Sequence, residues 1–263
     1  GTSKKNNSYK LRGNQLLNIL NKKFNLNVKD YDNLDYKFDL NKINNYIIFV
    51  IKKRKVIKKN EEILINNSKN IFINDLIDSD FNEIINNKNY FDCYITCNNY
   101  YKNLLKNKLN KLVFNIPHHL DIRLQKLEKR NINEIKLLYL GCKKFRKEFN
   151  CYYIDNLIND YQLKYIEWNA DIKIHSPEMI DQILNYNVHI DIRNPDSIAY
   201  KIKPGTKAVV AAAFNSIIIT TKHPGTYELL GSDYPYYCEC NYESVKKVIE
   251  LVKNTYNKPL WKK

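Results

Sequence analysis

The sequence predicts an α/β fold in which two parallel, doubly wound sheets follow each other along the chain. Strand-like apolar runs alternate with helix-like segments over most of the 263 residues, which is the pattern of successive βα units. The run 217–221 is apolar and β-branched, as expected for a strand covered on both faces. The alternation is interrupted at 117–121 and by the charged segment 122–134. We therefore expect domains over residues 1–121 and 135–263, with 122–134 as their linker.

Each expected element rests on a run with the period of a strand or a helix. In the first domain we expect strands at 26–29, 46–51, 70–74, 91–96 and 111–116, and helices at 14–20, 81–87 and 98–108. In the second domain we expect strands at 135–140, 163–167, 188–192, 217–221 and 236–238, and helices at 151–161, 177–184, 208–213, 227–231 and 242–254. Residues 4–13 are polar and loop-like with no strand before them, so the first strand of the usual pattern is expected to be absent.

The stretch 203–231 predicts a seat for phosphate. Its order is loop, Ala-rich helix, buried strand, loop and short helix. Pro204 suits a first helical turn, because its missing N–H would be unpaired there in any case. Free N–H groups at the helix start, flanked by Lys203 and Lys207, favour an anion. The alternative is a surface lysine pair on an ordinary α/β crossover.

The composition indicates which classes of binding partner the protein could have. The net charge is +15 and the pI about 9.3, which raises nucleic acid as a partner. The lysines are spread along the chain and accompany many Asn, Ile and Tyr residues, as codon bias in an AT-rich genome would produce. We therefore expect nucleotide phosphates or an anionic membrane surface to be equally good explanations of the charge.

The cysteines and the apolar runs indicate a protein of a reducing compartment, which we expect to be the cytoplasm. The cysteines form no matched C-x-x-C pairs, so we interpret them as reduced thiols in or near strands: Cys93, Cys97, Cys142, Cys151, Cys238 and Cys240. No apolar run reaches the length of a membrane span, and no signal peptide is recognised.

Several stretches, in their order and spacing, resemble GT-B type glycosyltransferases. Residues 94–105 are similar to the last strand-and-helix unit of the first domain in these enzymes. Ile116-Pro117-His118-His119-Leu120-Asp121 is similar to their interdomain I-P-N-G-I-D turn, with His-His in place of Asn-Gly. Residues 137–141 resemble the strand that opens the second domain. Asn215-Ser216-Ile217-Ile218 stands where the family has G-x-P-V-I, and 229–235 resembles the segment that follows.

The resemblance covers residues 90–255 well and residues 4–90 weakly. It implies two Rossmann-like domains facing each other across a cleft, with the C-terminal tail returning to the first domain. Two departures leave the subfamily open, as well as retention or inversion of configuration. The pair of glutamates seven residues apart in many retaining members is absent near Ile202 or Lys203 and at Val210. The family's Gly-Arg with a downstream Lys becomes Gly141-Cys142-Lys143-Lys144, with Arg146 close by.

The resemblance implies that basic side chains and helix N-termini hold the donor diphosphate without a tightly bound metal or cofactor. The candidate donor-binding residues are Gly141, Lys143, Arg146, Lys203, Lys207, Gly225, Thr226 and Glu228. His223 flanks the same loop. The alternatives are a solvated helix lysine at Lys207 and an N-terminal helix carboxylate at Glu228.

The candidate catalytic residues are His118, His119 and Asp78, the last beside Asp75 after a first-domain strand. Arg12 and Gly13 are candidates for the acceptor side. The alternatives are a packed hinge turn for the histidines, helix capping for the aspartates and a loop arginine. His175 and His189 are interpreted as structural.

We therefore expect a glycosyltransferase of hexosyl or deoxyhexosyl type. Its donor would be a UDP- or GDP-sugar, and its acceptor a glycan, glycolipid or glycoprotein, with peripheral membrane contact as a further expectation. The alternatives are an inactive GT-B scaffold or partner subunit, a basic nucleic-acid-binding α/β protein, and an epimerase of the same architecture.

Overall fold

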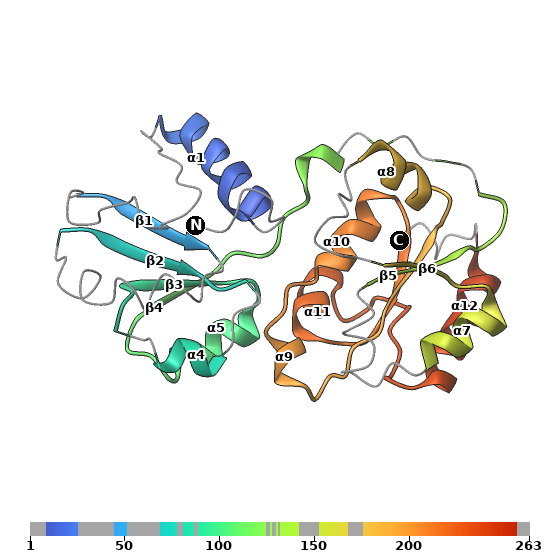
Figure 1. The fold of residues 1–263 in the computed structure, drawn as a ribbon. Helices are drawn as coiled ribbons and strands as arrows, with labels where there is room; N and C mark the ends of the chain where they lie inside the picture. The colour runs from blue at the N-terminus through green and yellow to red at the C-terminus, as the bar shows by residue number, and fades with distance from the viewer. Residues whose placement is uncertain are drawn as a thin grey trace. The chain divides into compact units, whose positions relative to one another are not determined.

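A computed structural model describes residues 9–25, 45–51, 69–77, 81–86, 89–124, 127, 130, 132–141, 153–167 and 176–256. The chain divides into two compact units, which are shown in Figure 1. Unit 1 comprises residues 1–117 and 202–204, and unit 2 comprises residues 118–201 and 205–263. Each unit is built on its own parallel sheet.

The described residues of unit 1 form four parallel strands in sequential order. They are β1 (Ile47–Ile51), β2 (Ile71–Asp75), β3 (Cys93–Thr96) and β4 (Leu112–Asn115). The crossover helices α4 (Phe81–Asn86) and α5 (Asn99–Lys106) lie on one side of this sheet (Figure 1). Before β1, a π-helical turn η1 (Tyr9–Gln15) leads into α1 (Leu16–Phe24) on the other side.

A buried ion pair joins the start of unit 1 to its sheet. Nε of Arg12 donates to Oδ2 of Asp75 at 2.9 Å, and Nη2 donates to Oδ1 at 3.2 Å. Nη1 donates to the carbonyl oxygens of Ile116 and Pro117, at 2.9 and 3.0 Å. The arginine side chain is fully enclosed. It therefore fastens η1 to the carboxyl ends of β2 and β4, which lie 63 and about 104 residues away in sequence.

In the part of unit 2 that the structure describes, four parallel strands lie in the order β6-β5-β7-β8. They are β5 (Leu137–Gly141), β6 (Lys164–Glu167), β7 (Val188–Asp191) and β8 (Ile217–Thr220). From β5 the chain moves outward to β6, and then returns to place β7 on the other side of β5. The carboxyl ends of β5 and β7 thus form a topological switch point, the place where open α/β sheets bind ligands.

Helices cover both faces of this second sheet. On β5, Leu137 and Tyr139 pack with α7 (Tyr153–Tyr161) and α12 (Tyr242–Thr255). The alternate residues Leu138 and Leu140 pack with α8 (Pro177–Ile183) and α10 (Thr206–Ala213). The remaining helices are short: η3 (Ile122–Leu124), α9 (Ile198–Lys201) and α11 (Pro224–Leu230).

The predicted α/β fold with parallel sheets is confirmed, and its strands and helices lie within a few residues of the expected ranges where the structure describes them. Some expectations were wrong. Residues 236–238 make only an isolated bridge from Tyr237 to Thr220, because Pro235 precedes it and the segment turns into α12. The loop expected at 4–13 is helical from Tyr9, and α11 begins at Pro224, where proline fits a first turn.

The strand expected at 26–29 lies outside the described residues. The domain limits 1–121, 122–134 and 135–263, and the return of the C-terminal tail to the first domain, stay predictions.

We expect Arg12→Ala to lower the free energy of unfolding by about 3–5 kcal/mol, because it leaves the carboxylate of Asp75 buried without a cation. Urea unfolding followed by circular dichroism measures the change. The matched control is Lys22→Ala, an exposed lysine of α1, which should change stability by less than about 0.5 kcal/mol. Equal unfolding midpoints for the two variants would show that the ion pair does not stabilise unit 1.

Candidate functional site

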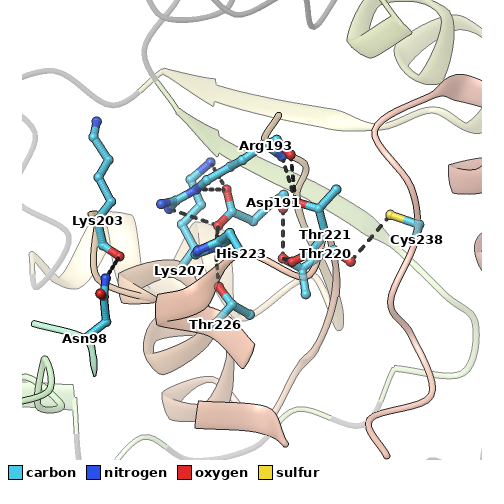
Figure 2. A network of polar contacts seen from close by, with 10 residues as sticks. All are labelled: Asn98, Asp191, Arg193, Lys203, Lys207, Thr220, Thr221, His223, Thr226 and Cys238. Atoms are coloured by element: carbon cyan, nitrogen blue, oxygen red, sulfur yellow. Dashed lines mark hydrogen bonds and ion pairs between the residues drawn. The ribbon is translucent and has the colours of Figure 1, made fainter. Parts of the chain in front are cut away.

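A buried carboxylate, that of Asp191, organises the switch point of unit 2 (Figure 2). Asp191 is the last residue of β7, and its side chain is 1% exposed. A carboxylate this deep must be paired with cations or hydrogen-bond donors to remain charged. Its partners come from three further places in the chain: the loop after β7, the first turn of α10 and the loop before α11.

Two cations share this carboxylate. Nε of Arg193 donates to Oδ1 of Asp191 at 3.0 Å, and Nη2 lies 2.9 Å from Oδ2, so the guanidinium meets the carboxylate with two of its nitrogens. Nζ of Lys207 lies 3.0 Å from Oδ1. The lysine is the most exposed of the three side chains, at 24%. Lys207 can therefore contact a ligand that arrives from solvent, while its ion pair with the buried Asp191 fixes the position of its ammonium group.

His223 and Thr226 complete the cluster. Nε2 of His223 lies 3.7 Å from Oδ2 of Asp191, and it also contacts Oγ1 of Thr226. Burial lowers the pKa of His223, and its hydrogen bond to Asp191 only partly offsets this, so the imidazole is neutral at neutral pH. We call Asp191, Arg193, Lys207, His223 and Thr226 the Asp191 cluster.

Two threonines fix the backbone that carries Asp191 and Arg193. Oγ1 of Thr220 donates to the carbonyl of Asp191 at 2.9 Å. Oγ1 of Thr221 donates to the carbonyl of Arg193 at 2.8 Å and accepts from its N–H at 3.1 Å. The loop after β7 is therefore pinned to the end of β8.

The charge of the cluster does not balance. Burial opposes the charge on Asp191, but Arg193, Lys207 and His223 outweigh it, and the pKa of Asp191 lies well below its ordinary value. Burial also opposes the charges on Arg193 and Lys207, and the adjacent carboxylate outweighs it, so the pKa of each is raised. Two cations thus accompany one anion, and an excess positive charge faces the switch point.

Three polar atoms of the cluster are buried without a hydrogen-bond partner among the described residues: Oδ2 of Asp191, Nη1 of Arg193 and Nδ1 of His223. Oδ2 of Asp191 is nevertheless held by the ion pair with Nη2 of Arg193 at 2.9 Å, so Nη1 and Nδ1 are the two that remain unused. Since the Nε2 nitrogen of a neutral His223 faces Asp191 and Thr226, its Nδ1 is left as an acceptor. One unused donor and one unused acceptor at a charged switch point are what a phosphate ester with hydroxyl groups could satisfy.

Close packing brings the surrounding elements onto the cluster. The ring of Tyr139, on β5, lies beneath Nζ of Lys207, which is 4.2 Å from the ring centroid. A Cβ on Gly141 would lie 2.3 Å from that ring. A Cβ on Gly205 would lie 2.6 Å from the carbonyl oxygen of Gly225. The glycine at the start of α10 thus lets α10 and α11 meet beside Asp191.

The structure brings some of the predicted donor residues together. Lys207 and Thr226 belong to the Asp191 cluster, Gly225 contacts the start of α10, and Gly141 ends β5 next to Tyr139. Glu228 is on the exposed face of α11. Lys203 belongs to unit 1, where its carbonyl accepts from Nδ2 of Asn98 at 3.0 Å.

Other predicted residues have no tested role. Lys143, Arg146 and Asp78 lie outside the described residues. His118 is buried in unit 2, and its ring is stacked with the ring of His119, with 6.1 Å between the two ring centroids. Arg12 is used in the buried pair with Asp75, and Gly13 is buried in η1. Their assignments to catalysis or to the acceptor side stay predictions.

Asp191 and Arg193 are the functional candidates that sequence analysis missed. A signal was present, since Asp-x-Arg begins at the last residue of a buried strand, at the carboxyl edge of a parallel sheet. His189, interpreted as structural, is enclosed on β7, and burial with the nearby Lys207 lowers its pKa to about 3.

Within the described residues, no group of three or more His, Cys, Asp and Glu side chains is placed to hold a metal ion. Among the described helices, none has the length and apolar character required to cross a bilayer.

Comparison with known proteins places the fold. No family model matches the chain, and no curated protein matches it by sequence. Sucrose-phosphate synthase from Thermosynechococcus elongatus is 11% identical, with a TM-score of 0.53, over 82% of this chain and 67% of that one. TarM is 10% identical, with a TM-score of 0.50, over 79% of this chain and 48% of that one.

The glycosylation-associated protein complex Gap123 from Streptococcus agalactiae is 10% identical, with a TM-score of 0.47, over 82% of this chain and 49% of that chain. The chain thus spans about half the length of TarM and of the Gap123 chain, and about two thirds of the synthase. The likeness to the synthase shows that the chain has an α/β fold of the GT-B type.

We expect Asp191→Asn to change the pH dependence of stability. The pKa of Asp191 is depressed in the folded protein, so its ionisation contributes stability that is present above the unfolded-state pKa of about 4. That contribution is lost as the pH falls below about 4 toward the folded-state pKa. The wild type should therefore lose stability more steeply than Asp191→Asn in this window.

Urea unfolding from neutral pH to about pH 2 measures both curves, with Asp196→Asn, at an exposed aspartate of the same unit, as the control. The control should follow the wild type. Parallel curves for wild type and Asp191→Asn would contradict a stabilising charge at Asp191.

Proposed function

We propose that the protein is a glycosyltransferase that moves a sugar from a nucleotide-sugar donor to a glycan or glycoconjugate acceptor. The observation that carries the proposal is the Asp191 cluster, in which two cations share one buried carboxylate at the switch point of the unit 2 sheet. The GT-B type of fold supports it, because glycosyltransferases are among the enzymes that have this fold.

The excess charge suits the leaving group of glycosyl transfer. As the bond between the sugar and the diphosphate breaks, negative charge grows on the diphosphate, and donors already in place stabilise it without reorganisation. In this proposal Nζ of Lys207 and Nη1 of Arg193 donate to the diphosphate oxygens. The first turn of α10 has no side-chain cap, so its N–H groups are also suited to meet an anion.

Asp191 is a positioning residue in this scheme. It holds the guanidinium of Arg193 and the ammonium of Lys207 within 3.0 Å of its oxygens, so both cations are oriented before a donor binds. Its negative charge also keeps both cations protonated despite their burial. Nδ1 of His223 would accept a hydrogen bond from a hydroxyl group of the donor.

The finer assignments belong to the same proposal. The donor is a UDP- or GDP-sugar, the transferred group a hexose or deoxyhexose, and the diphosphate is neutralised by side chains rather than by a metal. His118, His119 or Asp78 would supply the base that takes the acceptor proton, and a glycolipid acceptor would bring the protein to a membrane surface.

One observation favours a second candidate, an inactive GT-B scaffold. Many retaining members carry two glutamates in this region, whereas this chain has Ile202, Lys203 and Val210 at the corresponding positions. A scaffold of this kind could still bind a nucleotide at the Asp191 cluster, but it would neither transfer nor hydrolyse the sugar.

We expect a nucleoside diphosphate or its sugar to raise the melting temperature, because a ligand that binds only the folded protein stabilises it. A screen of UDP, GDP, CMP and dTDP, with their common sugars and with or without Mg²⁺, identifies the base. Lys207→Ala should weaken binding about tenfold or more, since a charge-assisted hydrogen bond contributes about 1.5–3 kcal/mol. Calorimetric titration of the folded variant measures this loss.

The matched control is Lys246→Ala, an exposed lysine on α12, which should bind like the wild type. If no nucleotide shifts the melting temperature of the folded wild type, the proposed donor site is wrong. If a sugar nucleotide binds but is neither transferred nor hydrolysed, the scaffold replaces the enzyme. Binding of DNA that weakens steeply with salt, without any nucleotide binding, would favour the nucleic-acid alternative.

A further inference from the structure

The sheet of unit 1 is covered on one face by its crossover helices. Alternate strand residues Val50, Phe72, Tyr94 and Val113 belong to one buried cluster with residues of α4 and α5. Ile84 of α4 and Leu105 of α5 are enclosed in the same cluster. Because successive strand residues point to opposite faces, the residues that precede and follow each of these four within its strand face the other side of the sheet.

That other side carries large apolar side chains that solvent reaches. Ile47 and Ile71 are neighbours in register on β1 and β2, and they are 61% and 50% exposed. Leu112 and Phe114, on the outermost described strand β4, are 67% and 51% exposed. The register places Leu112 beside Cys93 and Ile73, and hence on the same face as Ile71. Ile51, Cys93 and Ile95 lie on the same side but are buried, so solvent reaches the side only in part. We call the four exposed residues the open face of unit 1.

Helix α1 lies on the same side of the sheet as the open face (Figure 1). It is amphipathic, and it buries none of its residues. Ile19 and Phe24 are exposed, and Lys22 and Lys23 stand beside them in the last turn. Nζ of Lys23 lies 5.5 Å from the centroid of the Phe24 ring. This helix therefore adds apolar side chains and positive charge to the same side of unit 1.

Among the side chains of unit 1 that the structure describes, the exposed charges are mostly positive: six lysines against one carboxylate, that of Asp92. These lysines are Lys22, Lys23, Lys69, Lys106, Lys108 and Lys111. The described carboxylates are Asp75, which is buried with Arg12, and Asp92, whose Oδ2 accepts from the N–H of Phe72. Lys108 and Lys111 directly precede Leu112 and Phe114 in the chain. Apolar side chains next to unbalanced lysines complement an anionic, apolar surface.

We propose that the open face of unit 1, together with α1, docks on an anionic lipid surface. Apolar side chains such as Leu112 and Phe114 would enter the boundary between headgroups and acyl chains. The lysines would extend along the surface and place their ammonium groups among the lipid phosphates. A lipid surface fits better than a folded protein partner, because its phosphates complement the lysines and its fluid headgroup region needs no apolar surface of matching shape.

Flotation with vesicles of phosphatidylcholine, alone or mixed with phosphatidylglycerol, tests the proposal on the full chain. We expect binding only to the mixed vesicles, and weaker binding as salt screens the lysines. The double variant Leu112→Thr/Phe114→Thr should lower partitioning about tenfold or more, because it removes apolar area, while the threonines that it introduces suit a strand. Lys108→Gln/Lys111→Gln should lower it mainly at low salt.

The matched apolar control is Leu229→Gln/Leu251→Gln, at exposed positions of α11 and α12 in unit 2, which should float like the wild type. Circular dichroism shows whether each variant is folded. Absence of binding to the mixed vesicles, or equal loss in the control variant, would overturn the proposal. Sedimentation that shows a dimer which Leu112→Thr/Phe114→Thr dissociates would also overturn it, and would assign the open face to a second copy of the chain. None of these outcomes depends on nucleotide binding at the Asp191 cluster.

Discussion

The requirement that a buried carboxylate be paired determines how unit 2 is assembled around Asp191. A lone carboxylate at this depth would take up a proton or force the loop open. Its pairing with Arg193 fixes the loop after β7, its pairing with Lys207 fixes the start of α10, and its contact with His223 fixes the start of α11. Three chain segments that are separate in sequence therefore converge on one pair of oxygens.

This convergence depends on the small residues of α10. Ala208 and Ala211 are buried against Ile218 of β8, so the axis of α10 can lie close to the sheet. A bulkier helix would stand farther from β7 and β8, and Lys207 could not lie 3.0 Å from Asp191 while resting on the ring of Tyr139. The Ala-rich segment and the charged cluster are thus two parts of one arrangement: the first sets the spacing that the second requires.

Whether an interaction is local or long-range explains what the sequence could predict. Strand and helix periods are local, and β7, β8 and α10 were predicted within a few residues of their actual limits. Lys207 was expected at the site because the helix start after Pro204, which Lys203 and Lys207 flank, is visible in the sequence. The ion pair of Lys207 with Asp191 is not visible in the sequence, because it depends on the strand order β5-β7-β8. The pairing of Arg12 with Asp75, 63 residues away, depends on the tertiary fold in the same way.

Asp75 and Asp191, two of the buried aspartates among the described residues, show why a paired carboxylate is in one case part of the scaffold and in the other part of a site. Arg12 and Asp75 form a pair of zero net charge, and the remaining arginine contacts go to backbone carbonyls. A further anion would gain little there. At Asp191, no second carboxylate among the described residues neutralises the second cation, Lys207, and Nη1 of Arg193 has no hydrogen-bond partner among them either. Both sites end a parallel strand, so position on the sheet does not separate them. What separates them is the uncompensated charge, and this makes the Asp191 cluster the better candidate to receive an anion.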